Sequence, residues 1–196
     1  MATYKQNVGT TVVNYAGNYP GAVEGELWFD TTNVAFKYQF PAVTAAGSWS
    51  TGGSLNTARR HIRGAGIYTA ALAIGGYHTT PLANVESYNG SNWTEVNDLG
   101  TARYGGGAAG TSTAALYFGG GYPYKTNTET WNGTNWTEVN DLNAAKGSTT
   151  GSGATNTAAI VAGGSPSPVD AQTELWNGTN WTEVNDLGTG RYNTAS

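Results

Sequence analysis

The sequence predicts an all-β repeat fold, in which small four-stranded sheets follow one another along the chain. The first reason is a segment of 12 residues, Trp131 to Leu142, which returns unchanged as Trp176 to Leu187 and with two changes as Tyr88 to Leu99. The second is a glycine pair after an apolar stretch, which recurs every 44 residues. The third is the composition: only 11% of the residues are charged, and the abundant Gly, Thr, Asn and Ser favour strands and turns over helices.

Two sets of positions keep the same period, and we expect both to be structural. The tryptophans recur at spacings of 44, 43 and 45 residues, and they are Trp49, Trp93, Trp136 and Trp181. The second glycine of each pair recurs with them, and these are Gly76, Gly120 and Gly164. A period near 44 with a β-type composition is typical of β-propeller blades, each of which has four strands.

The strands of one unit can be placed from its pattern. We expect a glycine-rich inner strand over 103–110, an apolar strand over 113–120, an alternating strand over 126–131 and an outer strand over 136–142. Between the last two strands stand Asn132 and Gly133, which tolerate the positive φ of a tight hairpin turn.

The repeat divides the chain into an N-terminal segment, 1–54, and a repeat region, 55–196. The repeat region holds units 55–98, 99–141 and 142–186, and a partial unit 187–196. Because propellers close with roughly 4 to 8 blades, we expect an incomplete ring, of about three blades, in this chain. A longer parent polypeptide, several copies completing one ring, or an open array are the alternatives, and we favour a longer parent chain. We also expect a homo-oligomer.

The N-terminal segment predicts a β-hairpin over 25–40. Its apolar residues alternate, and they are Leu27, Phe29, Val34, Phe36 and Tyr38. The turn between the two strands is expected at 31–33.

The repeat resembles the kelch motif. In each unit a glycine pair is followed by an aromatic residue at 88, 131 or 176, and then by a tryptophan five residues later. The resemblance covers residues 49–196 and implies kelch-like blades. Kelch-type copper oxidases use a Cys–Tyr cofactor, and this chain has no cysteine.

The N-terminal hairpin resembles hairpins near the start of bacteriophage tail-fibre and other virion proteins. In marine phages such hairpins lead into repeats similar to the stretch from Trp49 to Arg59. The resemblance implies a virion protein, made in the host cytoplasm, whose N-terminal segment binds other virion proteins while the propeller projects outward.

Several classes of function are disfavoured by the sequence. The net charge is −4 and no basic cluster is present, so we expect no nucleic-acid partner. No apolar run is long enough to cross a membrane as a helix, so we expect no membrane insertion. The two histidines, His61 and His78, lie at different phases of the repeat, so we expect no metal site and no cofactor. The carboxylates of the 12-residue segment repeat in every unit, whereas active sites break symmetry, and we therefore expect no enzyme.

Candidate binding residues lie where otherwise matching repeats differ. These positions are the loops after the glycine pairs, which share one end of the blades and therefore one face of the expected disc. The candidates are Tyr77, His78, Tyr122, Tyr124 and Lys125. The sequence therefore predicts a structural virion protein of tail-fibre or appendage type that recognises a host-surface glycan or receptor, or packs structurally. The alternative is a cellular kelch scaffold that binds proteins.

Overall fold

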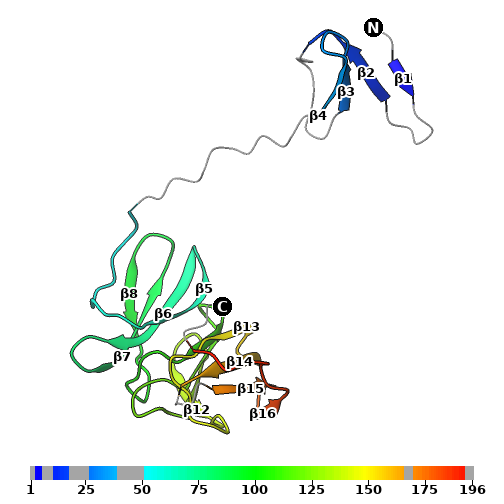
Figure 1. The fold of residues 1–196 in the computed structure, drawn as a ribbon. Coiled ribbons are helices and arrows are strands. Elements are labelled where there is room, and N and C mark those ends of the chain that lie inside the picture. The colour runs from blue at the N-terminus through cyan, green and yellow to red at the C-terminus, as the bar shows by residue number, and fades with distance from the viewer. Residues whose placement is uncertain (1–2, 6–10, 18–26, 39–50, 166–169, 193–196) are drawn as a thin grey trace. The chain divides into compact units, whose positions relative to one another are not determined.

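The computed structural model describes residues 3–5, 11–17, 27–38, 51–165 and 170–192. All elements of regular secondary structure in these ranges are β-strands. The strands form four sheets of four strands each (Figure 1). The chain divides into two compact units, Met1–Ser50 and Thr51–Ser196. The prediction of an all-β chain with small sheets is therefore confirmed.

The N-terminal unit is a mixed sheet. Its strands are β1 (Thr3–Lys5), β2 (Thr11–Tyr15), β3 (Leu27–Asp30) and β4 (Ala35–Tyr38), and they lie in that order. The pair β3–β4 is the expected antiparallel hairpin, with a turn over 31–34. The strands β2 and β3 run parallel, which the sequence pattern did not predict.

The structure buries the face of β3 opposite to the one that carries the alternating apolar residues of the sequence. The rings of Phe29 and Phe36 meet edge to face at 5.2 Å, but Phe36 is 65% exposed. The buried side chains of the strand are Trp28 and Asp30. Val34 lies in the turn with φ of 51° and is exposed, so it is not a strand residue.

A hydrogen-bond network explains why β3 buries a carboxylate. Asp30 Oδ1 accepts from the backbone N–H groups of Gly17 at 2.8 Å and Thr32 at 2.9 Å, and Oδ2 accepts from Asn33 Nδ2 at 2.7 Å. The bond from Asn33, with these backbone bonds, lowers the pKa of Asp30 to about 2, although burial opposes the shift. Asp30 therefore fastens the chain around Gly17 to the turn.

The second unit contains three repeat sheets, each an antiparallel meander in chain order. The first repeat sheet contains β5 (Arg63–Ile67), β6 (Ala70–Tyr77), β7 (Pro81–Tyr88) and β8 (Trp93–Val96). The second contains β9 (Gly107–Gly110), β10 (Ala115–Phe118), β11 (Thr128–Trp131) and β12 (Trp136–Val139). The third contains β13 (Gly151–Thr155), β14 (Ala158–Gly164), β15 (Asp170–Trp176) and β16 (Trp181–Val184).

The strands of the second repeat sheet lie inside the four stretches predicted for that unit. The hairpin turn between β11 and β12 follows the expected chemistry: the side chain of Asn132 accepts hydrogen bonds from the backbone N–H groups of Thr134 and Asn135. The first strands of neighbouring sheets lie side by side, because β9 contacts both β5 and β13.

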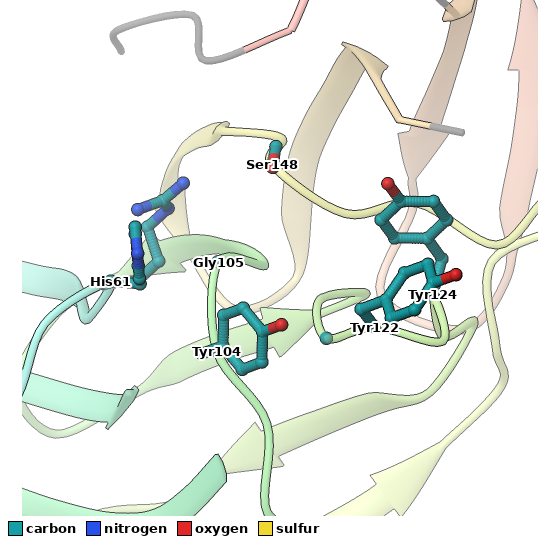
Figure 2. Close-up of a pocket in the computed structure, with 8 residues that line it drawn as sticks. His61, Tyr104, Gly105, Tyr122, Tyr124 and Ser148 are labelled. Carbon is teal, nitrogen blue, oxygen red and sulfur yellow. The ribbon is translucent and has the colours of Figure 1, made fainter. Parts of the chain in front are cut away.

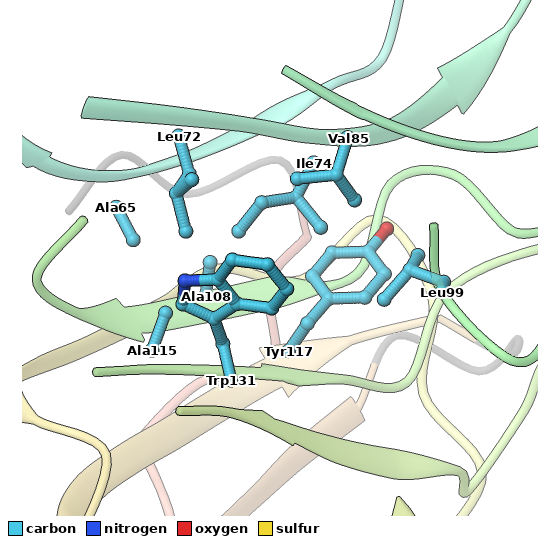
Figure 3. Packing of buried hydrophobic residues seen from close by; sticks show 9 residues of the cluster. All are labelled: Ala65, Leu72, Ile74, Val85, Leu99, Ala108, Ala115, Tyr117 and Trp131. Atoms are coloured by element: carbon cyan, nitrogen blue, oxygen red, sulfur yellow. The ribbon is translucent and has the colours of Figure 1, made fainter. Parts of the chain in front are cut away.

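Two hydrophobic clusters join the repeat sheets. The first lies between the first and second repeat sheets, and Figure 3 shows its buried members, which are Ala65, Leu72, Ile74, Val85, Leu99, Ala108, Ala115, Tyr117 and Trp131. The second lies between the second and third sheets and contains Ala109, Leu116, Phe118, Leu142, Ala159, Val161, Trp176 and Trp181. Strand β10 therefore buries alternate side chains on both of its faces, as expected for a sheet covered on two sides.

The third repeat sheet buries only one of its faces among the described residues. Leu116 of the second sheet is fully buried, whereas Ile160 at the equivalent position of the third sheet is 40% exposed. On the neighbouring strand, Leu175 is 42% exposed. The outward face of this sheet thus exposes an isoleucine at a position where the second sheet buries a leucine.

Both positions of the glycine pair require glycine, because of their backbone conformation and because neighbouring atoms lie too close for a side chain. Gly119 and Gly120 have φ of 64° and 98°, in the region that side chains disfavour. A Cβ on Gly119 would lie 2.6 Å from the carbonyl oxygen of Lys146, and one on Gly120 would lie 2.7 Å from that of Tyr104. The pair lets the connecting segments pass directly against the end of the apolar strand.

Each repeat sheet buries a cation beside a carboxylate, which the sequence analysis did not predict. Arg59 contacts Glu86, Lys146 contacts Asp170, and the Arg103 guanidinium lies 3.1 Å from Glu129. The cations are completely buried. Burial alone would raise the pKa of Glu86, but the bonds from Arg59 and nearby backbone N–H groups outweigh it and lower that pKa.

The segments that carry these cations connect neighbouring sheets. The backbone N–H of Arg103 donates to Leu82 O at 3.2 Å, and its carbonyl accepts from the N–H of Gly76 at 3.0 Å, so its main chain belongs to the first repeat sheet. Its guanidinium donates to the carbonyl oxygens of Asn127 and Tyr117 in the second repeat unit. Arg103 thus joins two sheets.

Candidate functional site

A cavity of about 370 Å³ opens between loops of the three repeat units, and Figure 2 shows it. Its lining residues are His61, Arg63, Tyr104, Gly105, Gly121, Tyr122, Tyr124 and Ser148. The volume lies in the range of small-molecule sites, roughly 300–1,000 Å³. Aromatic rings with hydroxyl groups, an imidazole and a guanidinium make this lining suited to hydrogen bonding and ring stacking.

One wall of the cavity is the loop that follows the glycine pair of the second unit. The N–H of Gly121 donates to Tyr104 O at 2.6 Å, and the N–H of Lys125 donates to Gly120 O at 3.0 Å, which fixes both ends of the loop. The rings of Tyr122 and Tyr124 meet edge to face at 5.7 Å, and a cis peptide bond follows Tyr122. The two backbone hydrogen bonds therefore hold the loop at the edge of the cavity.

The two tyrosines of this wall have different environments. The ring of Tyr124 packs so closely over Gly147 that a Cβ there would lie 2.4 Å from it. Tyr122 is 77% exposed. Tyr124 is therefore the fixed ring and Tyr122 the one that solvent or a ligand reaches freely.

The opposite wall is an aromatic cluster around Tyr104. The ring of Tyr104 lies 5.0 Å from that of Tyr77 and 5.9 Å from that of His61. In Figure 2 the hydroxyl group of Tyr104 points to the side on which Tyr122 lies. The guanidinium of Arg60 lies over the ring of Tyr77, 5.1 Å from its centre.

The structure brings together part of the predicted binding set. Tyr122 and Tyr124 line the cavity, and Tyr77 lies one ring behind its wall, against Tyr104. His78 is exposed in the turn between β6 and β7 and is not a lining residue. Lys125 is half-buried and pairs through its backbone with Lys146, so it lies outside the lining as well. The corresponding loop of the third unit, 166–169, lies outside the described residues.

Four lining side chains were not predicted as binding residues: His61, Arg63, Tyr104 and Ser148. All precede or begin the first strand of a repeat sheet, whereas the sequence analysis looked only at the loops after the glycine pairs. Tyr104 and Ser148 stand just after the repeated cations Arg103 and Lys146. A comparison of the repeats at the residues that follow these cations would have found Tyr104 and Ser148.

The predicted structural positions are packed against their neighbours to different degrees. Trp181 is buried, Trp93 and Trp136 are half-buried, and Trp49 lies outside the described residues. Each of these three described tryptophans meets the aromatic residue opposite it in the hairpin, at 4.9, 5.4 or 5.5 Å between ring centres. Gly76 and Gly164 have positive φ like Gly120.

Comparisons with known proteins add no family assignment. The sequence matches no protein-family model, and a search of curated proteins finds no match. Within the described ranges, no cluster of three His, Cys, Asp or Glu side chains is placed to hold a metal ion. None of the residues described forms a helix long and apolar enough to cross a membrane.

Proposed function

We propose that the three repeat sheets are kelch-like blades of a β-propeller and that the chain is a non-catalytic recognition module. Three observations support the architecture: each sheet is a four-stranded meander, the first strands of adjacent sheets lie side by side, and consecutive sheets bury apolar faces against each other. These features are those of blades arranged around an axis.

The observation that carries the function is the cavity formed by Tyr104, Tyr122 and Tyr124. Tyrosine offers a large apolar face and a hydroxyl group, and it loses little conformational entropy when it is held. Such rings suit a saccharide, whose ring faces are rich in C–H groups and whose edges carry hydroxyls. We therefore propose that the cavity binds a glycan by stacking and hydrogen bonding.

The biological setting follows from the resemblance of the N-terminal hairpin to virion hairpins. We propose a bacteriophage virion protein of tail-fibre or appendage type, in which the N-terminal segment binds other virion proteins and the repeat sheets bind a glycan of the host surface. Mass spectrometry of purified particles tests this setting, and failure to find the protein in any particle preparation would remove it.

The binding proposal is tested on a glycan array followed by calorimetry on the best saccharide. Tyr124→Ala should weaken binding at least 10-fold, because it removes the fixed ring of the cavity wall. Tyr68→Ala is the matched control, since Tyr68 is 88% exposed in the turn between β5 and β6 and does not line the cavity. Equal binding by both variants and the unchanged protein would refute the proposed site.

A further inference from the structure

The cavity lining includes a half-buried arginine that has no carboxylate partner among the described residues. Arg63 begins β5, and its Nη1 donates to Ile62 O at 3.1 Å while its Nη2 donates to Thr149 O at 2.9 Å. Its Nε is buried and has no hydrogen-bond partner. Burial lowers the pKa of this guanidinium, which means that its surroundings disfavour the charge.

The three fully buried cations of the repeat sheets are arranged differently. Arg59, Arg103 and Lys146 each contact a carboxylate. Arg63 has no such ion pair among the described residues, and both of its acceptors are neutral carbonyl oxygens. Withdrawing a charge from water without a counter-charge is unfavourable, so stability alone does not favour this arrangement.

The position of Arg63 also breaks the repeat. Arg63 pairs across the sheet with Ile74, whereas the second repeat sheet has Gly107 at the corresponding place, opposite Phe118. The repeat architecture therefore does not need a side chain here. An arginine that lines a cavity, at a position where the next repeat has glycine, is placed to bind a ligand rather than to maintain the repeat.

The cavity geometry points to an acidic sugar, and we propose that its carboxylate binds Arg63 while its ring lies against Tyr122 and Tyr124. A carboxylate in the cavity beside this guanidinium supplies the negative charge that the protein does not provide. This inference rests on the proposed glycan function and specifies its ligand class as saccharides that carry a uronic or sialic type of acid.

The experiment compares matched acidic and neutral saccharides by calorimetry. The probes are sialyllactose against lactose, and glucuronic-acid-terminated against glucose-terminated oligosaccharides of otherwise identical structure. We expect at least one acidic probe to bind 10-fold or more tightly than its neutral partner. Its affinity should fall as sodium chloride is raised, because salt screens the pairing with Arg63.

The variant Arg63→Gln should bind that acidic probe at least 10-fold more weakly, to the level of the neutral partner. Arg191→Gln is the control, because Arg191 is exposed and lies outside the lining. The salt dependence of the unchanged protein remains decisive if Arg63→Gln fails to fold. Equal affinity for acidic and neutral probes overturns this inference and leaves the glycan proposal standing, whereas binding of no saccharide at all overturns both.

Discussion

The indole Nε1–H of Trp181 donates a 3.0 Å hydrogen bond to Thr128 Oγ1 on the neighbouring repeat sheet. In the third sheet Thr173 occupies the equivalent position, and its hydroxyl is buried without a hydrogen-bond partner. In the second sheet it is the tryptophan, rather than the threonine, that has no hydrogen-bond partner. Its Trp136 Nε1 is buried and unpaired, because the first sheet has Val85 where the second has Thr128.

This difference predicts unequal effects of one substitution at two equivalent sites. Thr128→Val should lower the free energy of unfolding by about 1–3 kcal/mol, because it leaves the buried Trp181 Nε1–H unsatisfied. Thr173→Val should be neutral or slightly stabilising, because it removes a buried hydroxyl that has no partner. Urea denaturation followed by tryptophan fluorescence measures both, and equal losses would show that the inter-sheet bond contributes nothing.

Removal of one partner of a buried ion pair should destabilise the repeat sheets strongly. Glu129→Leu should destabilise the protein by about 3–5 kcal/mol, because it leaves the buried Arg103 guanidinium without its carboxylate. The exposed Glu138, opposite Glu129 on the adjacent strand, provides the control, and Glu138→Leu should change stability by less than about 0.5 kcal/mol. Thermal denaturation followed by circular dichroism compares the two variants.

The glycine pair should not tolerate a side chain. Gly119→Ala should cost at least about 2 kcal/mol, since a residue with a Cβ resists a positive φ and the new atom would meet Lys146 O. Gly188→Ala should be nearly neutral, because nothing lies within 4 Å of a Cβ there and its φ is ordinary. Chemical denaturation measures the free energy of unfolding of both variants. Similar stability of the two would contradict the requirement for glycine.

The N-terminal sheet should lose stability in acid at a defined pH. The pKa of Asp30 is lowered from 3.8 to about 2 by its hydrogen bonds. A lowered folded-state pKa stabilises the sheet fully above pH 3.8, and this contribution falls away as the pH drops toward 2. The carboxyl chemical shift of Asp30 follows the titration by NMR.

The variant Asp30→Asn is the comparison for that titration. It has no carboxylate at this position, so the N-terminal sheet should be less stable at neutral pH, and the part of its acid sensitivity between pH 4 and 2 should disappear. If the chemical shift of Asp30 in the unchanged protein titrates with a midpoint near pH 4, the hydrogen bonds from Asn33 and Gly17 do not persist in solution.

The sequence predicted the positions of the repeat strands because their signals are local. Hairpin turns such as Asn132-Gly133, and alternation around the apolar strand, act over a few residues and recur in every unit. The all-β architecture and the four strands of the second repeat sheet follow from these signals. The N-terminal sheet was harder, since β3 buries Asp30 through contacts with Gly17, which lies 13 residues away in the chain.

The candidate site was predicted only in part for a related reason. Tyr122 and Tyr124 were found because their loop varies between matching repeats. Arg63 and Tyr104 belong to the cavity only because the first strands of neighbouring sheets converge, which a linear pattern does not reveal. The buried partners Arg103 and Glu129 were missed because charged residues are usually exposed, although both recur with the period of the repeat.

The dual attachment of Arg103 has a consequence for how the protein unfolds. Loss of the first repeat sheet frees the main chain of this residue, and that removes the counter-ion of Glu129 inside the second. Lys146 repeats the arrangement one sheet further along, since its carbonyl accepts from the N–H of Gly120 while its ammonium contacts Asp170. Unfolding should therefore behave as a row of coupled units that frays from its two ends, with the slowest amide hydrogen exchange in β10.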